Sequence, residues 1–365
     1  MKWWRLLLLA QDDCDSDYDD YEALLLLRAR MALKERHYLT SPSLVATNPT
    51  PWTSMYATRD RSSFITSVSL DPDTFDLLLA SFATYYPVRH LRGSGGRPPK
   101  INNMHEALSL ILHFYSAPCE GKTLCALFGM PPATLARTLR KAEVALAEAL
   151  KSLHDAEIRY PTKRQQRQWG VIVSRVEPLV RGVWGFLDGK NYRVKSPTAA
   201  DLQNAYYNGW LHSTFVTGTL LFGADGTIVW GRHNFVGSWN DADTSMPLRV
   251  KLLDPTVTLA GHGVVSDSAF PVSGDLFGKI RTPLKDGDLD RATPECRAGL
   301  VQMSAALTSV RQAAEWGMGA TEKVYRQLLL PLPCNPTLRG LRLQNIFMLY
   351  NLRVRRTGIV TTTRM

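Results

Sequence analysis

Two short apolar runs stand out along the chain because each of them ends in an aspartate. Residues 183–188, in VWGFLDGK, close on Asp188, and residues 264–267, in GVVSDSAF, close on Asp267. Apolar runs of this length, bounded by turn signals, are typical of buried strands. Open α/β folds usually carry their chemistry at the carboxyl ends of such strands. We therefore predict two adjacent parallel strands with both carboxylates at one edge of a sheet.

A third acid lies on a predicted helix. In SVRQAAEWGMG, Arg311 and Glu315 are four positions apart, so they share a helix face. The chain between Asp267 and Glu315 is long enough for a loop and a helix that folds back over the sheet. Clustered carboxylates repel one another unless a proton or a metal intervenes, so the three acids suit a hard divalent cation, Mg²⁺ or Mn²⁺. Taken singly, each acid is equally well explained as a turn former or a solvated residue.

The remaining pattern predicts helices first and a mixed sheet later. Asp71 as N-cap and an apolar face from Phe75 to Phe82 predict one helix. β-Branched and aromatic residues on both sides of Asp225 and Gly226 predict a β-hairpin. The predicted order of strands, a helix and then a strand that carries an acid indicates an α/β or α+β fold.

A helix-turn-helix is predicted in KTLCALFGMPPATLARTLRKAE, residues 122–143. Gly129 lies at the turn, and Pro131 and Pro132 open the second helix. That helix would present four residues to a DNA major groove: Thr134, Arg137, Arg140 and Lys141. Helix pairs with a glycine turn also occur where they serve packing alone, and this alternative stays open.

Composition narrows the class of partner. The chain has 365 residues, 45% of them hydrophobic, which supports a real core. A formal net charge of +10 favours a polyanionic partner. A nucleic acid is favoured over a membrane, because the sequence has no 18-residue apolar span. Five scattered cysteines without CxxC spacing argue for a reducing compartment and against a zinc site.

Changes in composition predict three parts. Residues 1–70 are expected to be an N-terminal extension, partly disordered, because an acidic cluster and a Pro, Thr and Ser-rich linker lie within it. Residues 71–160 are expected to form a helical domain that contains the helix-turn-helix. Residues 161–365 are expected to form the domain with the acids.

Six blocks of this sequence carry a specific resemblance. In order they are FLDGK, QNAYYNGW, GSWND, VSDSAFP, RQAAEW and NLRVRRTGI. Together they resemble the nuclease domain of PIF/Harbinger-type DDE transposases and their domesticated relatives, over residues 169–359. By that resemblance Asp188, Asp267 and Glu315 match the metal-binding catalytic acids, and Asp241 in GSWND matches a further metal-associated acid.

The chain departs from the family pattern at two positions. The family often has a histidine before the acid of the GSWND block and a threonine after the DG of the first block. Asn240 and Lys190 stand at these positions. The departures leave the three acids intact, but they put in doubt any histidine function beside Asp241.

The resemblance implies a fold, a mechanism and partners. The fold would be an RNase H-like mixed sheet flanked by helices, preceded by an all-α region with a helix-turn-helix. Asp188 would bridge two divalent ions, with Asp267 and Glu315 each completing one side, for hydrolysis of a DNA phosphodiester and strand transfer. Four arginines would contact the DNA backbone: Arg311, Arg353, Arg355 and Arg356. A nuclear location and a Myb-like accessory protein for sequence-specific binding are also implied, and a homo-oligomer is compatible with the resemblance.

Three rival interpretations stay open. The first is a domesticated relative that keeps nuclease activity or DNA binding for a host function. The second is an inactive relative that acts only as a DNA-binding regulator. The third is a metal-dependent phosphohydrolase acting on small substrates, which the net charge of +10 disfavours.

Overall fold

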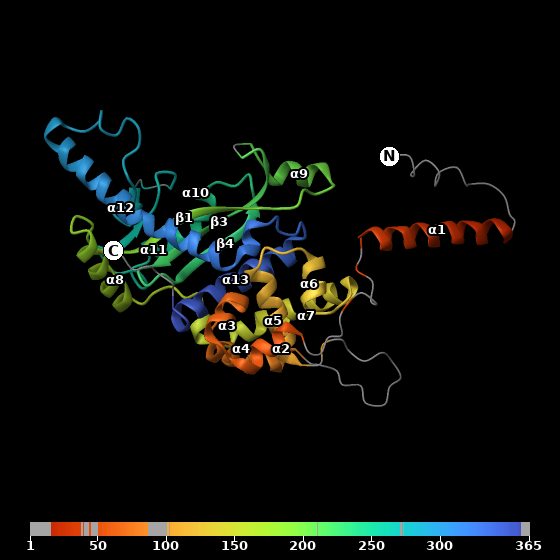
Figure 1. Ribbon diagram of the computed structural model, residues 1–365. Coiled ribbons are helices and arrows are strands. Elements are labelled where there is room, and N and C mark those ends of the chain that lie inside the picture. The colour runs from red at the N-terminus through yellow and green to blue at the C-terminus, as the bar shows by residue number, and fades with distance from the viewer. Residues whose placement is uncertain are drawn as a thin grey trace.

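A six-stranded mixed sheet forms the centre of the C-terminal part of the molecule (Figure 1). The computed structural model describes residues 16–37, 39, 44, 50–86, 101, 103–209, 211–270, 272 and 274–358. The strands are β1 (Val183–Arg193), β2 (Tyr207–Asn208), β3 (Ser213–Gly223), β4 (Ile228–Val236), β5 (Gly263–Val265) and β6 (Ile280–Arg281). Strands β4, β3 and β1 pair antiparallel, whereas β5 and β6 continue the sheet beyond β1 in parallel. The short β2 pairs with the start of β3.

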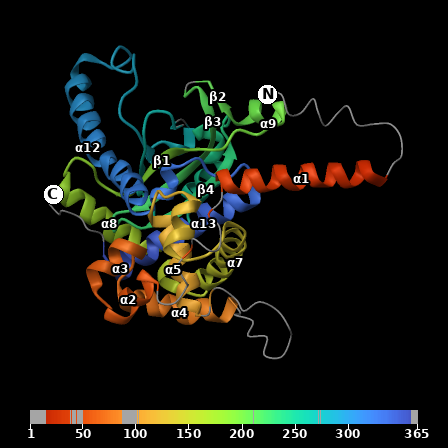
Figure 2. The same ribbon diagram turned by 45° about the vertical axis from the view of Figure 1, so that its right-hand side comes forward.

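Helices precede, interrupt and follow the sheet. Before it lie α1 (Ser16–His37), α2 (Pro51–Thr58), α3 (Arg61–Val68), α4 (Pro72–Tyr85), α5 (Met104–Ser116), α6 (Gly121–Leu127), α7 (Pro132–Lys151) and α8 (Lys163–Val176). Within or after it lie α9 (Ala200–Tyr206), α10 (Asp241–Thr244), α11 (Met246–Leu253), α12 (Pro294–Val324) and α13 (Pro336–Arg356). Short 3₁₀ turns are η2 (His154–Ala156), η3 (Gly274–Leu276) and η4 (Arg326–Leu329). Figures 1 and 2 show the first half of α12 projecting from the body. No helix among the described ranges is long and apolar enough to cross a membrane.

Strand β1 is longer than the sequence pattern predicts. It continues for 11 residues to Arg193, so Asp188 lies in its middle, opposite Leu220 of β3, and the prediction that Asp188 ends the strand is wrong. The long antiparallel partner β3 keeps β1 extended beyond the acid. On the other side, β5 has only three residues and ends at Val265, level with Phe186. Asp188 therefore lies where β1 has lost its parallel neighbour, and that edge of the strand is open.

The predicted hairpin and the predicted helix at Asp71 are confirmed. Strands β3 and β4 are joined by a turn in which Gly226 has φ 81°, a conformation that favours glycine. The Asp225 carboxylate accepts hydrogen bonds from the Thr227 backbone N–H (3.0 Å) and hydroxyl (2.7 Å), which fixes the turn. Helix α4 begins at Pro72, and the Asp71 side chain caps it by accepting from the Thr74 N–H (3.0 Å).

Residues 50–70 pack against the helices that follow them, α4 to α7, which together with α2 and α3 form the helical unit. Trp52 on α2 and Phe64 on α3 are 3% and 0% exposed, and they contact Phe75 on α4. The helical unit therefore begins at residue 50, not at the expected boundary of 71. Of the remainder of the predicted extension, the structure describes helix α1 (Ser16–His37), Leu39 and Leu44.

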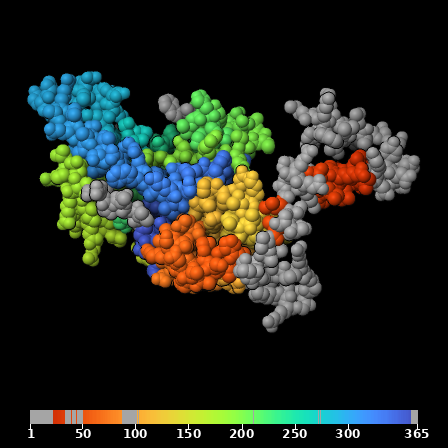
Figure 3. All heavy atoms as spheres, viewed as in Figure 1, coloured from red at the N-terminus to blue at the C-terminus, as the bar shows by residue number. Residues whose placement is uncertain are grey.

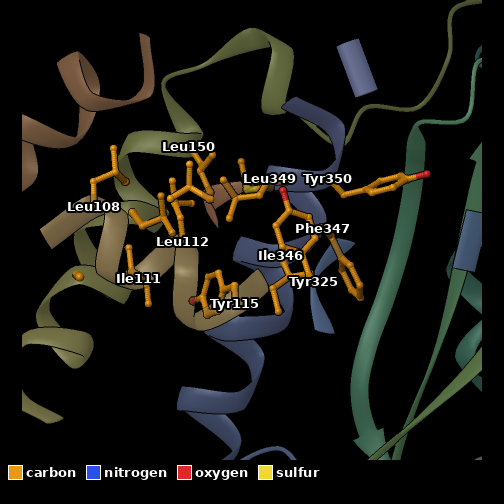
Figure 4. Packing of buried hydrophobic residues seen from close by; sticks show 14 of the residues in the cluster. Leu108, Ile111, Leu112, Tyr115, Leu150, Tyr325, Ile346, Phe347, Leu349 and Tyr350 are labelled. Carbon is orange, nitrogen blue, oxygen red and sulfur yellow. The ribbon is translucent and has the colours of Figure 1, made fainter. Parts of the chain in front are cut away.

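One apolar core joins the helical unit to the sheet. Helix α13 supplies Ile346, Phe347 and Leu349, all 0% exposed, and they pack among side chains of α5 and α7 (Figure 4). The same cluster includes Leu220 and Phe222 of β3. The helix that closes the predicted 161–365 domain thus lies between the sheet and the helices before it. Two smaller apolar clusters fill the spaces between the sheet and α8, α11 and α12.

A buried ion pair fixes α13 against α7. Arg342 Nε donates to Glu143 Oε1 at 2.7 Å, and the two side chains are only 9% and 2% exposed. The Tyr115 hydroxyl donates to the same Glu143 oxygen (3.2 Å), and Asn345 donates to the Glu143 carbonyl (2.9 Å). Because the two charged groups and the Tyr115 hydroxyl have partners, much of the cost of removing them from water is offset, whereas Asn345 Oδ1 is buried without a partner among the described residues.

Two glycines on α12 offer a direct test of its packing against the sheet. A Cβ on Gly317 would lie 2.7 Å from the Phe222 ring, whereas a Cβ on Gly319 would meet nothing within 4 Å. We expect Gly317→Ala to lower the free energy of unfolding by about 1–3 kcal/mol through overpacking. Gly319→Ala should raise it by about 0.5–1 kcal/mol, because alanine favours helix. Urea unfolding measures both, and equal effects would contradict the close contact between α12 and β3.

Candidate active site

Three aspartates gather beside the open edge of β1, past the end of β5. Asp188 lies on β1, Asp267 follows β5 by two residues, and Asp241 is the first residue of α10. Because Phe186 and Val265 are register partners, Asp188 and Asp267 come at the same level of the sheet. The predicted meeting of these two acids beyond adjacent parallel strands is therefore confirmed.

Asp241 can lie against β1 because Gly189 has no side chain. A Cβ on Gly189 would lie 2.3 Å from Asp241 Oδ1, so the carboxylate occupies the space that a side chain would take. Phe186 packs among α12 side chains, so alternation along β1 puts Asp188 on the face that carries α12 and Gly189 on the opposite face. Asp241 thus approaches β1 from the face opposite to Asp188.

Asn240 and Lys190, the two departures from the family pattern, have structural partners. The Asn240 side chain caps α10 by accepting from the Asp243 N–H at 2.9 Å. Lys190 Nζ lies 2.8 Å from Glu322 Oε1 of α12. Asn240 therefore fixes the start of the helix that carries Asp241, and Lys190 ties β1 to α12.

The electrostatics of the site disfavour a full set of charged carboxylates. Burial first, and the neighbouring Asp267 second, raise the pKa of Asp188 to about 6. Arg311 opposes this rise, whereas Asp241 adds to it. The pKa of Asp241 is also raised, by burial first and by Asp267 second. Such repulsion is relieved by a proton or by a cation, which is the behaviour expected of a metal-binding acid cluster.

This pKa shift makes the stability of the metal-free protein depend on pH. The folded-state pKa of Asp188, about 6, lies above the ordinary value of 3.8, so folding favours the protonated acid. We expect Asp188→Asn to stabilise the metal-free protein by about 2–3 kcal/mol above pH 6. The gain should shrink as the pH falls from 6 to 4, where wild-type Asp188 is protonated as well. Thermal unfolding in EDTA across this range measures the difference, and a gain independent of pH would contradict the buried, repelled carboxyl.

Glu315 lies on the expected helix but does not join the aspartates. Arg311 Nη2 donates to Glu315 Oε1 at 2.6 Å, and the Glu315 side chain is 50% exposed. Arg311, Glu315 and Glu322 form one stripe along α12, at spacings of four and seven residues. Arg311 and Glu322, before and after Glu315 in this stripe, face β1. The charge of Arg311 lowers the pKa of Asp188, and Glu322 forms an ion pair with Lys190. Glu315 is thus on the face of α12 that faces the site, held by Arg311.

The donor set suits a hard divalent cation, although the acids do not close into a finished cage. Within the described part of the chain, no group of three or more His, Cys, Asp and Glu side chains is arranged to hold a metal ion. The chemistry still fits, since carboxylate oxygens are the ligands that Mg²⁺ and Mn²⁺ prefer. Arg311 is the cation that counters the raised pKa of Asp188. Asp188 and Glu315 lie on the side of the sheet that carries α12, and Asp267 lies at the open edge of β1. Asp241 comes from the opposite side of the sheet.

The predicted DNA-reading helix is α7, which follows α6 and a turn with Gly129 at φ 58°. Arg137, Arg140 and Lys141 are exposed on it, and Thr134 is half-buried. The other face of α7 is built into the apolar core, with Leu135 5% and Leu146 0% exposed. The helices and the basic face exist as predicted, but they do not by themselves define a helix-turn-helix that reads DNA.

The basic tail of α13 is largely used inside the fold. Arg353 is 7% exposed and donates to the Ser69 carbonyl, so the expectation that it contacts DNA is wrong. Arg355 donates to the carbonyls of Asp155 and Glu157, both at 2.9 Å. Arg356 pairs with the Asp155 carboxylate at 3.1 Å. These arginines fasten the end of α13 to η2 and to the helical unit.

A hollow of about 420 Å³ opens beside Asp241. Asn191 of β1 and Trp239 contribute to its lining, and Trp239 is 45% exposed and stacks on Phe235 at 4.8 Å. Nearby Tyr206 is 6% exposed and belongs to the apolar core, whereas Trp239 does not. Of the four acids, Asp241 alone lines the hollow.

Two features of the site were missed from the sequence. Gly189 is needed because Asp241 occupies its side-chain space, and the glycine directly after Asp188 was the available signal. Glu322 pairs with Lys190 and stands seven residues after Glu315, a spacing that places both acids on one helix face.

Part of the chain matches a known protein family. Residues 187–351 match the family described as DDE superfamily endonuclease. The matched stretch contains all four acids, Asp188, Asp241, Asp267 and Glu315. No curated protein and no solved structure matches the chain. A domain of this family suggests nuclease or transposase activity with DNA as the substrate, and the superfamily normally uses a divalent metal.

Gly189 provides a test of Asp241 that leaves every acid in place. We expect Gly189→Ala to displace the Asp241 carboxylate, because the new Cβ would lie 2.3 Å from its Oδ1. DNA cleavage should fall by about 10–100-fold, the usual effect of losing a group that supports metal ligands. Gly209→Ala, whose Cβ would meet nothing within 4 Å, is the matched control. The cleavage rates of both variants measure this effect, and circular dichroism checks that both are folded. Equal cleavage rates would contradict a function for Asp241.

Proposed function

We propose that the protein is a divalent-metal-dependent DNA endonuclease of the PIF/Harbinger transposase type. The observation that carries the proposal is the meeting of Asp188 and Asp267 beyond β5, with a pKa of about 6 for Asp188, inside a stretch that matches DDE superfamily endonucleases. The reaction would be hydrolysis of a DNA phosphodiester, followed by strand transfer. Asp188, Asp267 and Glu315 would be the catalytic acids.

The arrangement of the sheet supports an RNase H-like fold. Antiparallel β4, β3 and β1 are followed by parallel β5 and β6, and the acids come from the middle of β1 and from the end of β5. A long helix, α12, crosses the same side of β1 as Asp188 and brings Glu315. In this proposal, two strands and one helix would supply the three acids.

In this proposal the acids would bind the metal, and Arg311 would position the DNA phosphate. Asp188 and Asp267 would hold the divalent ion, Glu315 would join them from α12, and Asp241 would support Asp267. Bound there, the ion would supply Lewis acidity and lower the pKa of a water molecule. Arg311, which holds Glu315 at 2.6 Å, would release it and contact the scissile phosphate.

DNA contacts outside the acids are also proposed. The exposed residues Arg137, Arg140 and Lys141 on α7, with the half-buried Thr134, would contact DNA, as a helix-turn-helix would. We further propose a nuclear location and a Myb-like accessory protein for sequence-specific binding, and self-association is compatible with this arrangement. The net charge of +10 supports a polyanionic ligand.

A second candidate is a domesticated or inactive relative that acts as a DNA-binding regulator. The observation that favours it is the Arg311–Glu315 ion pair, which keeps the third acid out of the aspartate cluster. In that case the acids would be dispensable, whereas the basic surface would not.

Cleavage of a labelled DNA duplex by the purified full chain separates the two candidates. The endonuclease predicts nicking with Mg²⁺ or Mn²⁺ and none in EDTA. Salt-sensitive DNA binding without cleavage under the same conditions would instead favour the regulator.

A further inference from the structure

A second charged feature lies at the opposite end of the sheet from the acids. It is a hollow of about 530 Å³ between α8, the start of β1, the turn before β5, and β6. We call it the basic hollow, and its charged lining consists of Arg167, Arg175, Arg181 and Arg281. Helix α8, yellow-green in Figure 3, lies at the edge of the molecule below α12.

The four arginines face the basic hollow without counter-charges. No acidic side chain lines the hollow, and none of the four arginines has an ion pair among the described residues. Glu177, at the end of α8, lies outside the lining, and its carboxylate accepts from the Leu179 N–H at 3.4 Å. Four unpaired guanidinium groups around one hollow repel one another unless an anion binds between them.

The backbone around the hollow is fixed and leaves space. Arg281 Nη1 donates to the Arg181 carbonyl at 2.5 Å, which holds the start of β1. A Cβ on Gly182 would lie 2.5 Å from the Gly261 carbonyl, so this corner requires glycine, and Gly182 has φ 69°. The His262 ring packs against Gly170, where a Cβ would lie 3.3 Å from it. The hollow is therefore built by packed segments that lie far apart in the sequence.

We propose that the basic hollow binds a phosphate of the DNA backbone at a point separate from the cleavage site. Guanidinium groups bind phosphate through paired, charge-assisted hydrogen bonds, and four of them suit a polyanion. Asp188 comes six positions after Gly182, which is about 20 Å at strand spacing. That span is less than the roughly 34 Å of one duplex turn, so a duplex held at the acids is long enough to reach the hollow. The inference rests on the proposed function, which supplies DNA as the ligand.

The test is the salt dependence of DNA binding by the full chain, measured by fluorescence anisotropy on a 30-bp duplex in EDTA. Each phosphate contact adds roughly 0.9 to the slope of log K against log salt. Arg167→Gln/Arg175→Gln should lower the magnitude of the slope by about 2 and weaken binding on all sequences alike. The matched control is Arg28→Gln/Arg30→Gln, two exposed arginines of α1, which should keep the wild-type slope.

The outcomes separate this inference from the proposed function. A wild-type slope in Arg167→Gln/Arg175→Gln, or an equal fall in the α1 control, would overturn the site even if the protein cleaves DNA. Absence of metal-dependent cleavage, with the slope changed as expected, would overturn the nuclease and keep the phosphate site. Saturable binding of inorganic phosphate that the double variant loses, with an unchanged slope for DNA, would assign the hollow to a free anion and overturn the proposal.

Discussion

Asp188→Asn will lose metal-dependent DNA cleavage by about a thousandfold and will keep its affinity for DNA. Metal ions stabilise the charge of a phosphoryl transition state by several kcal/mol, and each 1.4 kcal/mol is a factor of ten in rate. Asparagine has the shape of aspartate but no charge, so the fold is kept while the metal ligand at the middle of β1 is lost. Single-turnover cleavage of a labelled duplex in Mn²⁺ measures the rate, and anisotropy in EDTA measures the affinity.

The control for this experiment lies on α10, close to the site. Asp243 is exposed, two residues from Asp241. Asp243→Asn removes the same charge and should cleave DNA at close to the wild-type rate. If Asp188→Asn and Asp243→Asn cleave alike, Asp188 is not a metal ligand and the active site is elsewhere.

Arg342→Met will lower the free energy of unfolding by about 3–5 kcal/mol. The substitution leaves Glu143 charged, 2% exposed and without the cation that lies 2.7 Å away in the wild-type protein. Because α13 lies between the sheet and the helical unit, the loss should appear as a lower midpoint of the main unfolding transition. Urea unfolding, followed by tryptophan fluorescence, measures it.

Two further variants decide whether the buried charge is the cause. Glu143→Gln/Arg342→Met removes both charges and keeps an acceptor for the Tyr115 hydroxyl, so it should regain most of the lost stability. Lys151→Ala breaks the exposed Lys151–Glu148 pair on the same helix and should cost less than about 1 kcal/mol. A cost for Arg342→Met as small as that for Lys151→Ala would mean that the pair does not hold α13 to α7.

The sequence predicts the strands and the convergence of two acids well, because apolar runs that end in aspartate are local signals. Asp188 was placed at the end of its strand because an acid in the middle of a strand is uncommon. What keeps β1 extended is pairing with the long β3, a contact between distant segments. For the same reason, the sequence could not tell that β5 ends level with Phe186 and so leaves the edge of β1 open.

Burial of charged residues was the least predictable feature. Arg353 lies in the basic tail of the sequence, for which the resemblance implies a contact with the DNA backbone. In the structure the segment before α4 packs within the helical unit, and Ser69 in that segment accepts from Arg353. The ion pair between Arg311 and Glu315 follows from their spacing, but the spacing does not say that the pair holds the third acid away from the aspartates. The residues that line the basic hollow come from four separate segments, so no local sequence pattern predicts it.

The central claim is that Asp188 and Asp267 bind a divalent cation, and Mn²⁺ binding measures this directly. Electron paramagnetic resonance of free Mn²⁺, titrated with wild-type protein at pH 7.5, should show saturable binding that Mg²⁺ displaces. Asp188→Asn and Asp267→Asn should each abolish that binding, whereas Asp243→Asn should keep it. Equal Mn²⁺ binding by all four proteins would contradict the claim.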